Sequence, residues 1–364
     1  MRGTKSAQQE DMFSYVSMED AIPQSHPLRR IKEFVEPILA EMWPDFDGLY
    51  SSTGRPSIPP EQLLKALLIQ VLYTIRSETQ LVEQLHYNLL YRWFVGLGMS
   101  GAVWERSTFS KNRERLISGE VADRFFALVV TLAESKGLVS KEHFSVDGSV
   151  IEAWASLKSF QKKEDKTSPD NDKKDGGSGS NPNVDFRGEK RTNKTHESST
   201  DPESRIYKKG VQSAKMSFLG HVMMENRNGI AVDARVTQAH GTAEVDSAVE
   251  MASALKAGAT IGADKGYDSD KTTKDLRKLG MTSHAAQNIN AGRYSSLIDG
   301  RTTRHSGYEV SRRKRKRIEE IFGWLKTIGL MRRPMYRGKS KIDWAFTFAL
   351  AIYDLVRIKN LCPA

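Results

Sequence analysis

Apolar residues recur at helical spacing through residues 28–136. In one segment they return every three or four positions, as on the buried face of a helix: Leu63, Leu64, Leu67, Leu68, Val71 and Leu72. Pro59 and Pro60 fit the first turn of this helix. Ser77–Gln80 has the form of a capping box and predicts a second helix that continues through Phe94.

Two further segments extend this helical region. Residues 107–116 form a basic element, and Val121–Ser135 reads as a helix that Gly137 ends. The pattern therefore predicts a helical domain over residues 28–138, preceded by a flexible N-terminus over residues 1–27.

From about Glu142 the pattern changes to short strand-like runs. Met216–Met224 and Ile230–Val236 flank a turn whose Asn228-Gly229 supplies the positive φ angles of a hairpin. One strand is expected to end at Asp147, and two more lie at Thr260–Asp264 and Thr282–Ala286. Helical periodicity marks four later segments: Thr242–Ala257, Ser269–Leu279, Tyr308–Ile328 and Ile342–Ile358. This mixture predicts an α/β domain over residues 139–364, a mixed sheet flanked by helices.

One segment fits neither kind of element. Between Gln161 and Ser204 the only apolar side chains, prolines aside, are Val184 and Phe186. Such a composition cannot offset the entropy lost on ordering the chain. We expect a flexible insertion over about residues 161–204.

Charge and cysteine content narrow the class of protein. The net charge is +10 over 364 residues, which favours a polyanionic partner. A single cysteine, Cys362, leaves no disulfide framework. There is neither the apolar core of a signal peptide nor a run of about eighteen apolar residues. We expect a cytoplasmic protein that is associated with the nucleoid and has no membrane partner.

Three acidic residues stand in settings that suit ligands of a divalent cation. Asp147 and Asp264 each follow an apolar run, 117 residues apart, and Glu319 follows the basic run Arg312–Arg317. Carboxylates are the preferred ligands of Mg²⁺ and Mn²⁺, and two such ions about 3.5–4 Å apart can stabilise both the entering and the leaving oxygen of a phosphodiester. The eight histidines show no zinc-binding spacing. Metal-assisted chemistry on a nucleic-acid backbone is the hypothesis.

The first two acids have plain alternatives. Asp147-Gly148 could simply form a turn at a strand end. Asp268 and Asp270 compete with Asp264, which we prefer because it ends an apolar run, where ligands collect in α/β sheets.

Glu319 also has a non-catalytic interpretation, as a member of a surface ion pair. On one continuous helix, Arg315, Glu319, Phe322 and Lys326 would form a stripe, and a surface Arg315–Glu319 pair would contribute only a few tenths of a kcal/mol. Glu320 lies about 100° further around that helix.

Basic residues could form a surface that follows a DNA backbone, or merely solvated faces. The candidates are Arg312, Arg313, Arg315, Arg317 and Lys326, with a second patch at Lys111 and Arg113. Tyr267, Trp154 and Trp324 could stack on unpaired bases, although aromatic residues near short strands more often belong to a core.

Seven strings of this sequence resemble the DDE transposases of bacterial insertion sequences, with an InsH-type N-terminal domain. In chain order they are Gly54–Leu64, Tyr91–Gly96, Ser107–Arg113, Asp147–Ser156, Gly220–Gly229, Ala263–Tyr267 and Ile318–Lys326. In this family the third acid lies in a Tyr, Arg, Glu, Lys signature with two, three and six intervening residues. Arg315, Glu319 and Lys326 match it, whereas Arg312 stands at the tyrosine position and Tyr308 lies one turn earlier.

The resemblance implies an RNase H-like catalytic domain and a DNA transposase. Asp147, Asp264 and Glu319 would be catalytic and hold two Mg²⁺ ions, with Mn²⁺ as a substitute, and Arg315 and Lys326 would bind phosphate. The protein would cut the element ends at their terminal inverted repeats and join the freed 3′-hydroxyl to target DNA, as a homodimer. The N-terminal helices would recognise the repeats or form the dimer. A nuclease on the same fold and an inactive DNA-binding relic are the alternatives.

Overall fold

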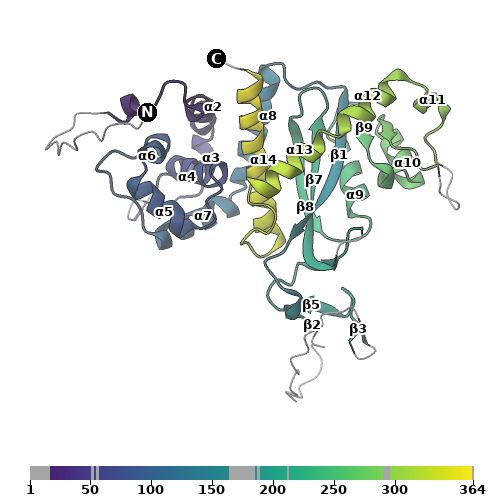
Figure 1. Ribbon diagram of the computed structural model, residues 1–364, viewed down its shortest axis with the longest axis horizontal. Coiled ribbons are helices and arrows are strands. Elements are labelled where there is room, and N and C mark those ends of the chain that lie inside the picture. Colours follow the sequence, from purple (N-terminus) through teal and green to yellow (C-terminus); the bar gives the residue numbers. More distant parts are fainter. Residues whose placement is uncertain are drawn as a thin grey trace, which may run out of the picture.

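The computed structural model describes residues 17–50, 53–54, 57–163, 185–186, 189–210, 213–289 and 296–362. Its N-terminal part is helical and its C-terminal part is built on a mixed sheet (Figure 1). The N-terminal helices are α1 (Met18–Ala21), α2 (Pro27–Glu41), α3 (Trp43–Asp47), α4 (Pro60–Leu72), α5 (Glu78–Tyr87), α6 (Leu89–Val95), α7 (Arg106–Ser118) and α8 (Val121–Ser135).

The main sheet has the order β10-β9-β1-β7-β6, and β8 also pairs with β7. Its strands are β1 (His143–Glu152), β6 (Arg205–Tyr207), β7 (Lys215–Glu225), β8 (Ala231–Gln238), β9 (Thr260–Ala263) and β10 (Thr282–Ala285). β7 runs antiparallel to β1, β6 and β8, whereas β9 runs parallel to β1 and β10. The α/β class predicted from the sequence is confirmed.

Helices cover both faces of this sheet. They are α9 (Ala243–Ala252), α10 (Asp270–Lys278), α11 (Gly300–Thr303), α12 (Ser306–Arg315), α13 (Ile318–Thr327) and α14 (Lys339–Leu361), with short 3₁₀ turns η1 (Leu157–Ser159) and η2 (Lys265–Tyr267). One apolar core joins α2–α8 to α13, α14 and one sheet face, and a second core holds α9 and α10 against the other face.

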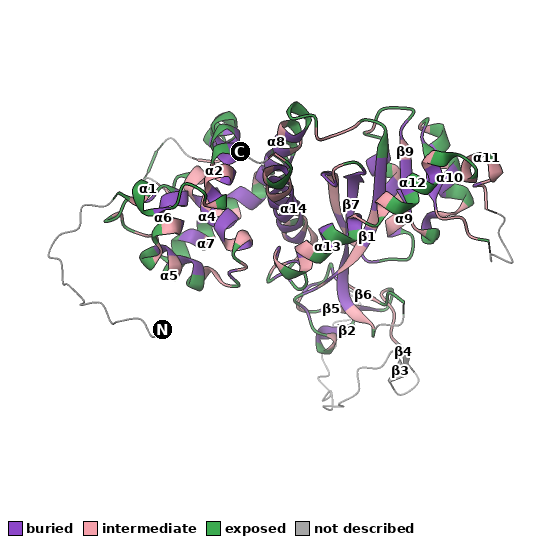
Figure 2. Ribbon diagram, turned by 45° about the horizontal axis from the view of Figure 1, so that its top comes forward, coloured by how far each residue is buried: buried purple, intermediate pink, exposed green. Residues whose placement is uncertain are grey.

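Helix α14 stands between the helical domain and the sheet (Figure 1), where it packs on α2, α4, α8 and β8. Most of its residues are buried, as Figure 2 shows along its length. Phe125 of α8 and Phe348 of α14 pack with ring centroids 5.5 Å apart. The predicted boundary at residue 138 therefore separates two sequence patterns but not two independent cores.

Two carboxylates of α14 accept hydrogen bonds from backbone N–H groups on the edge of β8 that pairs with no other strand of the described residues. Asp343 accepts a hydrogen bond from the Val236 N–H at 2.8 Å, and Asp354 accepts one from the Ala231 N–H at 3.0 Å. A bulge lies between these two positions, because Met223 pairs with Asp233 and Met224 with Ala231. Since a bulge adds one residue to a strand, both N–H groups can face the helix although they are five residues apart. The helix thus covers a strand edge that would otherwise be open to other chains.

Several local signals act as predicted. The Ser77 hydroxyl accepts a hydrogen bond from the Gln80 N–H at the start of α5. Gly137 and Gly229 have φ angles of 68° and 73°, the left-handed conformation that glycine adopts without strain. They end α8 and form the β7–β8 turn, respectively.

Two predicted helices are each broken into two. The helix expected to run from Ser77 through Phe94 stops at Asn88, whose side chain caps α6 by accepting from the Leu90 and Tyr91 N–H groups. The helix expected at Tyr308–Ile328 breaks at Lys316 and Arg317, between α12 and α13. Consecutive like charges in the basic run disfavour a continuous helix there. The stripe that would join Arg315 to Glu319 on one helix is therefore wrong.

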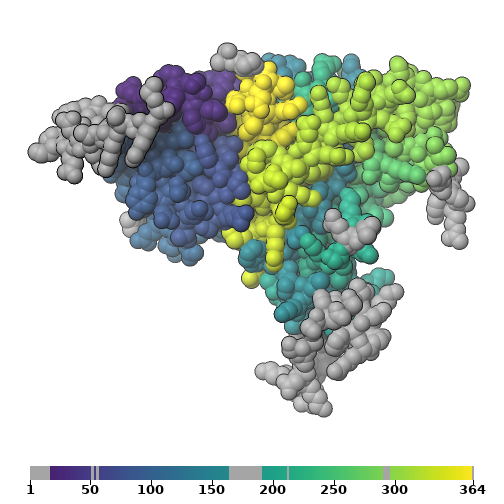
Figure 3. Space-filling view, in the orientation of Figure 1, coloured from purple at the N-terminus to yellow at the C-terminus, as the bar shows by residue number. Residues whose placement is uncertain are grey.

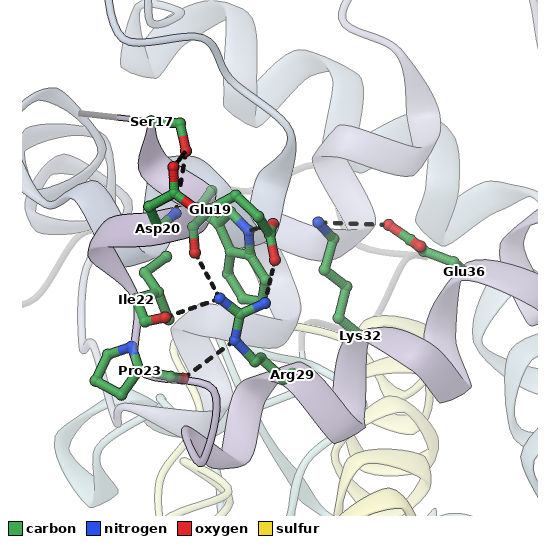
Figure 4. Close-up of polar contacts among 9 residues, drawn as sticks. Ser17, Glu19, Asp20, Ile22, Pro23, Arg29, Lys32 and Glu36 are labelled. Carbon is green, nitrogen blue, oxygen red and sulfur yellow. Dashed lines mark hydrogen bonds and ion pairs between the residues drawn. The ribbon is translucent and has the colours of Figure 1, made fainter. Parts of the chain in front are cut away.

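Part of the N-terminal segment, and the flanks of the predicted insertion, form more structure than expected. Residues 1–16 lie outside the described part, but residues 17–26 are held in place. Arg29 donates to the carbonyls of Ile22 and Pro23 at 2.8 and 3.1 Å and pairs with Glu19 (Figure 4). The predicted flexible stretch 1–27 is thus wrong for its last part.

The flanks of the predicted insertion also form structure. β2 (Phe160–Lys162) pairs with β5 (His196–Ser198), and β3 (Asp185–Phe186) pairs with β4 (Glu189–Lys190). Asp201 is buried and accepts from the Gly338 N–H at 3.2 Å. Residues 164–184 and 187–188, the middle of the insertion, lie outside the described residues.

Candidate active site

Asp147 and Asp264 occupy equivalent positions on neighbouring parallel strands. Three β1 residues, His143–Ser145, each pair with the β9 residue 117 positions later, as in Ser145 with Gly262. The two acids have the same offset just beyond this ladder, and the charge of Asp264 acts on the carboxyl of Asp147. Side chains at matching positions of parallel strands point to the same face of the sheet.

Asp147 lies inside β1 and not at its end, contrary to the prediction. β7 pairs with β1 from Phe144 to Glu152 and keeps the strand extended past the Asp-Gly dipeptide. Gly148 does not form a turn; it lets the Glu244 side chain come close to β1, because a Cβ on it would lie 2.9 Å from Glu244 Oε1. The acid is thereby held on a central strand with a paired backbone.

The edge of β1 beside Asp147 has no strand partner on the β9 side. On this side of β1, β9 pairs with His143–Ser145 and no further. Further along, the Gly148 carbonyl accepts from Lys209 Nζ at 2.8 Å, and the same ammonium donates to Glu244 Oε1 at 2.6 Å. Where β9 stops, the two acids therefore lie next to a lysine–glutamate pair. In α/β sheets this is the place where ligands bind.

The helices α12 and α13 cross the sheet on the face that carries both acids. A Cβ on Gly262 would lie 2.9 Å from Ser145 Oγ and 3.7 Å from the Ser311 carbonyl of α12. Lys326 of α13 donates to Ser149 Oγ at 2.6 Å. Asp147 is placed between Ser145 and Ser149 on this face, and Glu319 lies in the chain between the two helix contacts.

The side chain of Glu319 is exposed in this arrangement. Within the described ranges, no three His, Cys, Asp or Glu side chains are close enough together to hold a metal ion. The structure thus brings together Asp147 and Asp264, and places Glu319 on the covering helix without its carboxylate joining the pair. Glu320 takes another direction, with its carboxylate 3.7 Å from Arg357 Nη1 on α14.

Burial and nearby like charges shift the titration of Asp147. Burial raises the pKa of Asp147 to about 6; the charge of Lys209 and the Gly148 N–H oppose this rise, while Asp264 and Glu244 add to it. Burial lowers the pKa of Lys209, but its bond to Glu244 and the charges of Glu244, Asp147 and Asp264 outweigh that effect and raise it overall. Carboxylates that repel one another in a partly dry site are suited to a divalent cation.

Tyr267 lies under this site and does not face a base. Its side chain is only 2% exposed and its hydroxyl has no hydrogen-bond partner among the described residues. Burial raises its pKa, and the charges of Asp147, Glu244 and Asp264 act in the same direction. Of the other aromatic residues proposed for stacking, Trp324 packs edge-on to Tyr353, and Trp154 is 38% exposed.

The basic residues divide into exposed and internal groups. Arg312 and Arg313 are exposed on α12, which runs with α13 as a yellow-green band on the surface in Figure 3. Arg315 is partly buried near Tyr267, and Arg317 donates to the Arg227 carbonyl. Tyr308, one turn before the signature position, is buried and donates to the Ala285 carbonyl at 3.0 Å, so it anchors α12 to β10.

The second patch is only half exposed. Lys111 is exposed on α7. Arg113 instead pairs with Glu78 and lies over the ring of Tyr336, 5.2 Å from its centroid. Its guanidinium is used to join α5 and α7 to the segment before α14, and we leave it out of the proposed DNA surface.

Lys209, Glu244 and Ser149 were missed by the sequence analysis. Lys209 follows the insertion in a polar segment, and Glu244 lies in the first turn of a helix, so neither is part of a recognisable motif. Only the folded chain brings them to Asp147.

Comparisons with known proteins agree with this fold. The family model "Transposase domain (DUF772)" matches residues 16–115, and "Transposase DDE domain" matches residues 186–354, which include Asp264 and Glu319 but not Asp147. A helical region followed by a mixed-sheet DDE domain defines the class. The chain belongs to the DDE transposases.

Solved structures give only remote likenesses. A piggyBac transposase synaptic complex with hairpin DNA is 12% identical with a TM-score of 0.41, over 90% of this chain and 74% of that chain. The Mos1 transposase paired-end complex with the left transposon end is 10% identical with a TM-score of 0.20, over 84% and 81% of the two chains. No curated protein matches the sequence. No helix in the described part is long and apolar enough to cross a membrane.

Proposed function

We propose that this transposase binds the terminal inverted repeats of its element, cleaves strands at the element ends and joins the 3′-hydroxyl to target DNA. The observation that supports the proposal is the register of β1 and β9, because Asp147 and Asp264 share its offset just beyond the last pair and the charge of Asp264 acts on Asp147. An acid pair of this kind, covered by a cationic helix, suits metal-assisted phosphodiester chemistry.

Asp147 and Asp264 would hold Mg²⁺ or Mn²⁺, with Glu319 as the third ligand. The donor set fits, because hard cations take carboxylate oxygens and Asp147 is held in a partly buried place where its charged form is disfavoured until a cation is bound. Two such ions, when bound, supply stabilisation of the charge on the entering and leaving oxygens. Glu319 would complete the site through a change of side-chain direction at the start of α13.

The residues of the chain would position the DNA. Arg315 and Lys326 lie on either side of the acid pair on α12 and α13, where they would bind the phosphates next to the cut. Arg312, Arg313 and Arg317 would follow the backbone away from it. Lys209 would hold the carbonyl of Gly148 and so fix the strand that carries Asp147.

The helical N-terminal domain would recognise the repeats, with Lys111 of α7 on its exposed surface. We propose that the active form is a homodimer, because two element ends must be held together for joining. The site of action would be the bacterial cytoplasm, at the nucleoid.

A strand-transfer assay tests this function. Labelled DNA carrying the element ends is incubated with protein and Mg²⁺, and cut and joined products are separated. Joined product supports the proposal, cutting alone favours a nuclease, and binding without cutting favours an inactive relic.

Glu319 and Glu320 provide a matched pair of variants. Glu319→Gln is expected to lower cleavage by at least about a hundredfold, because one ligand charge is lost, while DNA binding stays within about threefold. Glu320→Gln removes only an ion pair with Arg357 and should leave cleavage nearly unchanged. The opposite ranking in a gel-based cleavage assay would assign the third acid to Glu320.

A further inference from the structure

A cavity of about 930 Å³ lies between the helical domain and the catalytic domain. One wall comes from α4, α5 and the start of α7, and the other from Trp154, residues 326–336 and α14. We call this cavity the interdomain groove. None of the proposed catalytic acids lines it.

The groove is strongly cationic. Arg76, Arg106, Arg332 and Arg333 line it with exposed side chains, and none forms an ion pair with an acid of the described residues. Its one acidic lining residue, Glu78, is already paired with Arg113. Four guanidinium groups without an acidic partner in the described part of the chain line one cavity, although Arg333 also donates to the Trp154 carbonyl at 3.2 Å. They favour an anionic occupant, and arginine is especially suited to phosphate.

The groove also offers a partly exposed aromatic ring and an unpaired polar group. Trp154 is 38% exposed and lies under the Arg333 guanidinium, 5.0 Å from ring centroid to Cζ. Trp344 also lines the groove, and its indole N–H is buried without a hydrogen-bond partner among the described residues. A tryptophan–arginine stack is a platform for a nucleobase, and the indole N–H is a donor for a base or phosphate oxygen.

The groove reaches the active site at one end. Lys326 lines it and also donates to Ser149 Oγ, two residues from Asp147 on the same strand face, which is about 7 Å away. Trp154 is seven residues beyond Asp147, or at most about 23 Å along the strand direction. An occupant of the groove would therefore extend over a few nucleotides from the cut.

We propose that the interdomain groove binds an unpaired segment of the DNA strand next to the cleavage site. Trp154 and Arg333 stack on a base, and Arg76, Arg106 and Arg332 contact phosphates. A volume of about 930 Å³ is in the range of a small-molecule site, so it accepts a few nucleotides of one strand and not a duplex. This inference rests on the proposed function and adds the path of one strand to it.

The test compares a single strand with a duplex. Binding of fluorescein-labelled oligothymidylate (dT10) and of a blunt duplex is measured by fluorescence anisotropy with full-length protein. Trp154→Ala is expected to weaken dT10 binding by about 5- to 150-fold, as for loss of one stacked base, and to change duplex binding by less than about threefold. Trp154→Phe should recover most of the affinity, and Arg333→Ala should behave like Trp154→Ala.

Trp43→Ala serves as the matched control, because Trp43 is 53% exposed on α3, outside the groove. Thermal unfolding of each variant checks that it is folded. Equal losses for dT10 and duplex, or no loss for either, would overturn the proposal. So would a shift in sedimentation of Trp154→Ala, which would make the groove a contact between copies of the protein.

The outcomes separate this inference from the proposed function. If the wild-type protein binds duplex DNA and joins ends but does not bind dT10, only the proposal for the groove is contradicted. If the protein neither binds duplex DNA nor cuts it, the proposed transposition mechanism is contradicted.

Discussion

In its ionised form, the carboxyl of Asp147 lowers the stability of the folded, metal-free protein. Its pKa of about 6 in the folded chain exceeds the ordinary 3.8, so the folded state binds the proton more tightly than the unfolded state does. The resulting stabilisation is complete below pH 3.8 and is lost as the pH rises through about 6. At neutral pH the ionised group lies in a partly buried site near two other acids.

Asp147→Asn should therefore stabilise the metal-free protein. The amide can still accept the Gly148 N–H but carries no charge, so we expect a gain of about 1–2 kcal/mol at pH 8, after allowance for solvent, and little gain at pH 4. Urea unfolding with EDTA at both pH values measures it. Asp45→Asn, an exposed partner of Arg124, is the control. An equal gain at both pH values would mean that shape and not charge is responsible.

Lys209 is expected to hold Asp147 in its ionised form. Its charge lowers the pKa of that carboxyl, so Lys209→Met should raise this pKa further in the metal-free protein, and Lys209→Arg should restore it. Carbon-13 NMR of the aspartate side chains follows the titration directly. Lys271→Met, whose partner is Asp246 on the surface, should leave the Asp147 titration in place. A titration that does not move in Lys209→Met would contradict the expectation.

At the level of elements, α14 depends on two buried or half-buried acids that bind the β8 edge. Burial raises the pKa of Asp354 well above its ordinary value, so its contribution to stability is present at low pH and is lost as the pH rises. Its hydrogen bond to Ala231 is separate from that charge.

Two variants distinguish the hydrogen bond of Asp354 from its charge. Asp354→Leu leaves the Ala231 N–H without an acceptor and should cost about 1–3 kcal/mol at any pH. Asp354→Asn keeps an acceptor and should equal or exceed the wild type in free energy of unfolding at pH 8. Chemical denaturation at pH 4 and pH 8 gives both values. If Asn were as damaging as Leu at pH 8, the ionised form would be the stabilising one.

Helix and strand ends that depend only on residues nearby in the sequence could be predicted from it. Ser77, Gly137 and Gly229 act through caps and turns that involve only the next few residues. The persistence of β1 past Asp147 depends on β7, about seventy residues away. A pattern search sees the Asp-Gly dipeptide but not the distant strand that keeps it extended.

The candidate site shows the same division. Asp147 and Asp264 could be proposed as metal ligands from their apolar settings, and Glu319 from its place in a family signature; these roles stay predictions. Their relative positions could not, because a spacing of 117 residues says nothing about strand register until the ladder is known. Lys209 and Glu244 meet Asp147 only through tertiary packing.

At the scale of the whole molecule, the helical and catalytic parts should unfold together. One apolar core includes α2–α8, α13, α14 and a sheet face, with Phe125 against Phe348 at its centre. Phe125→Ala is expected to cost about 3–5 kcal/mol and to weaken both parts equally. Hydrogen exchange measured in α4 and in β7 would show a common loss of protection. Loss confined to α4 would reveal an independent helical domain.

The central place of α14 also constrains how the protein is made. This helix is translated after every element on which it packs, and its last residue follows the end of α8 by 226 positions. At ribosomal speeds of about 5–20 residues per second, the helical part waits roughly 10–45 s for the partner that closes its apolar face. Products that stop short of residue 339 leave that face exposed to chaperones and proteases. Premature termination should thus yield short-lived fragments and not a stable DNA-binding competitor.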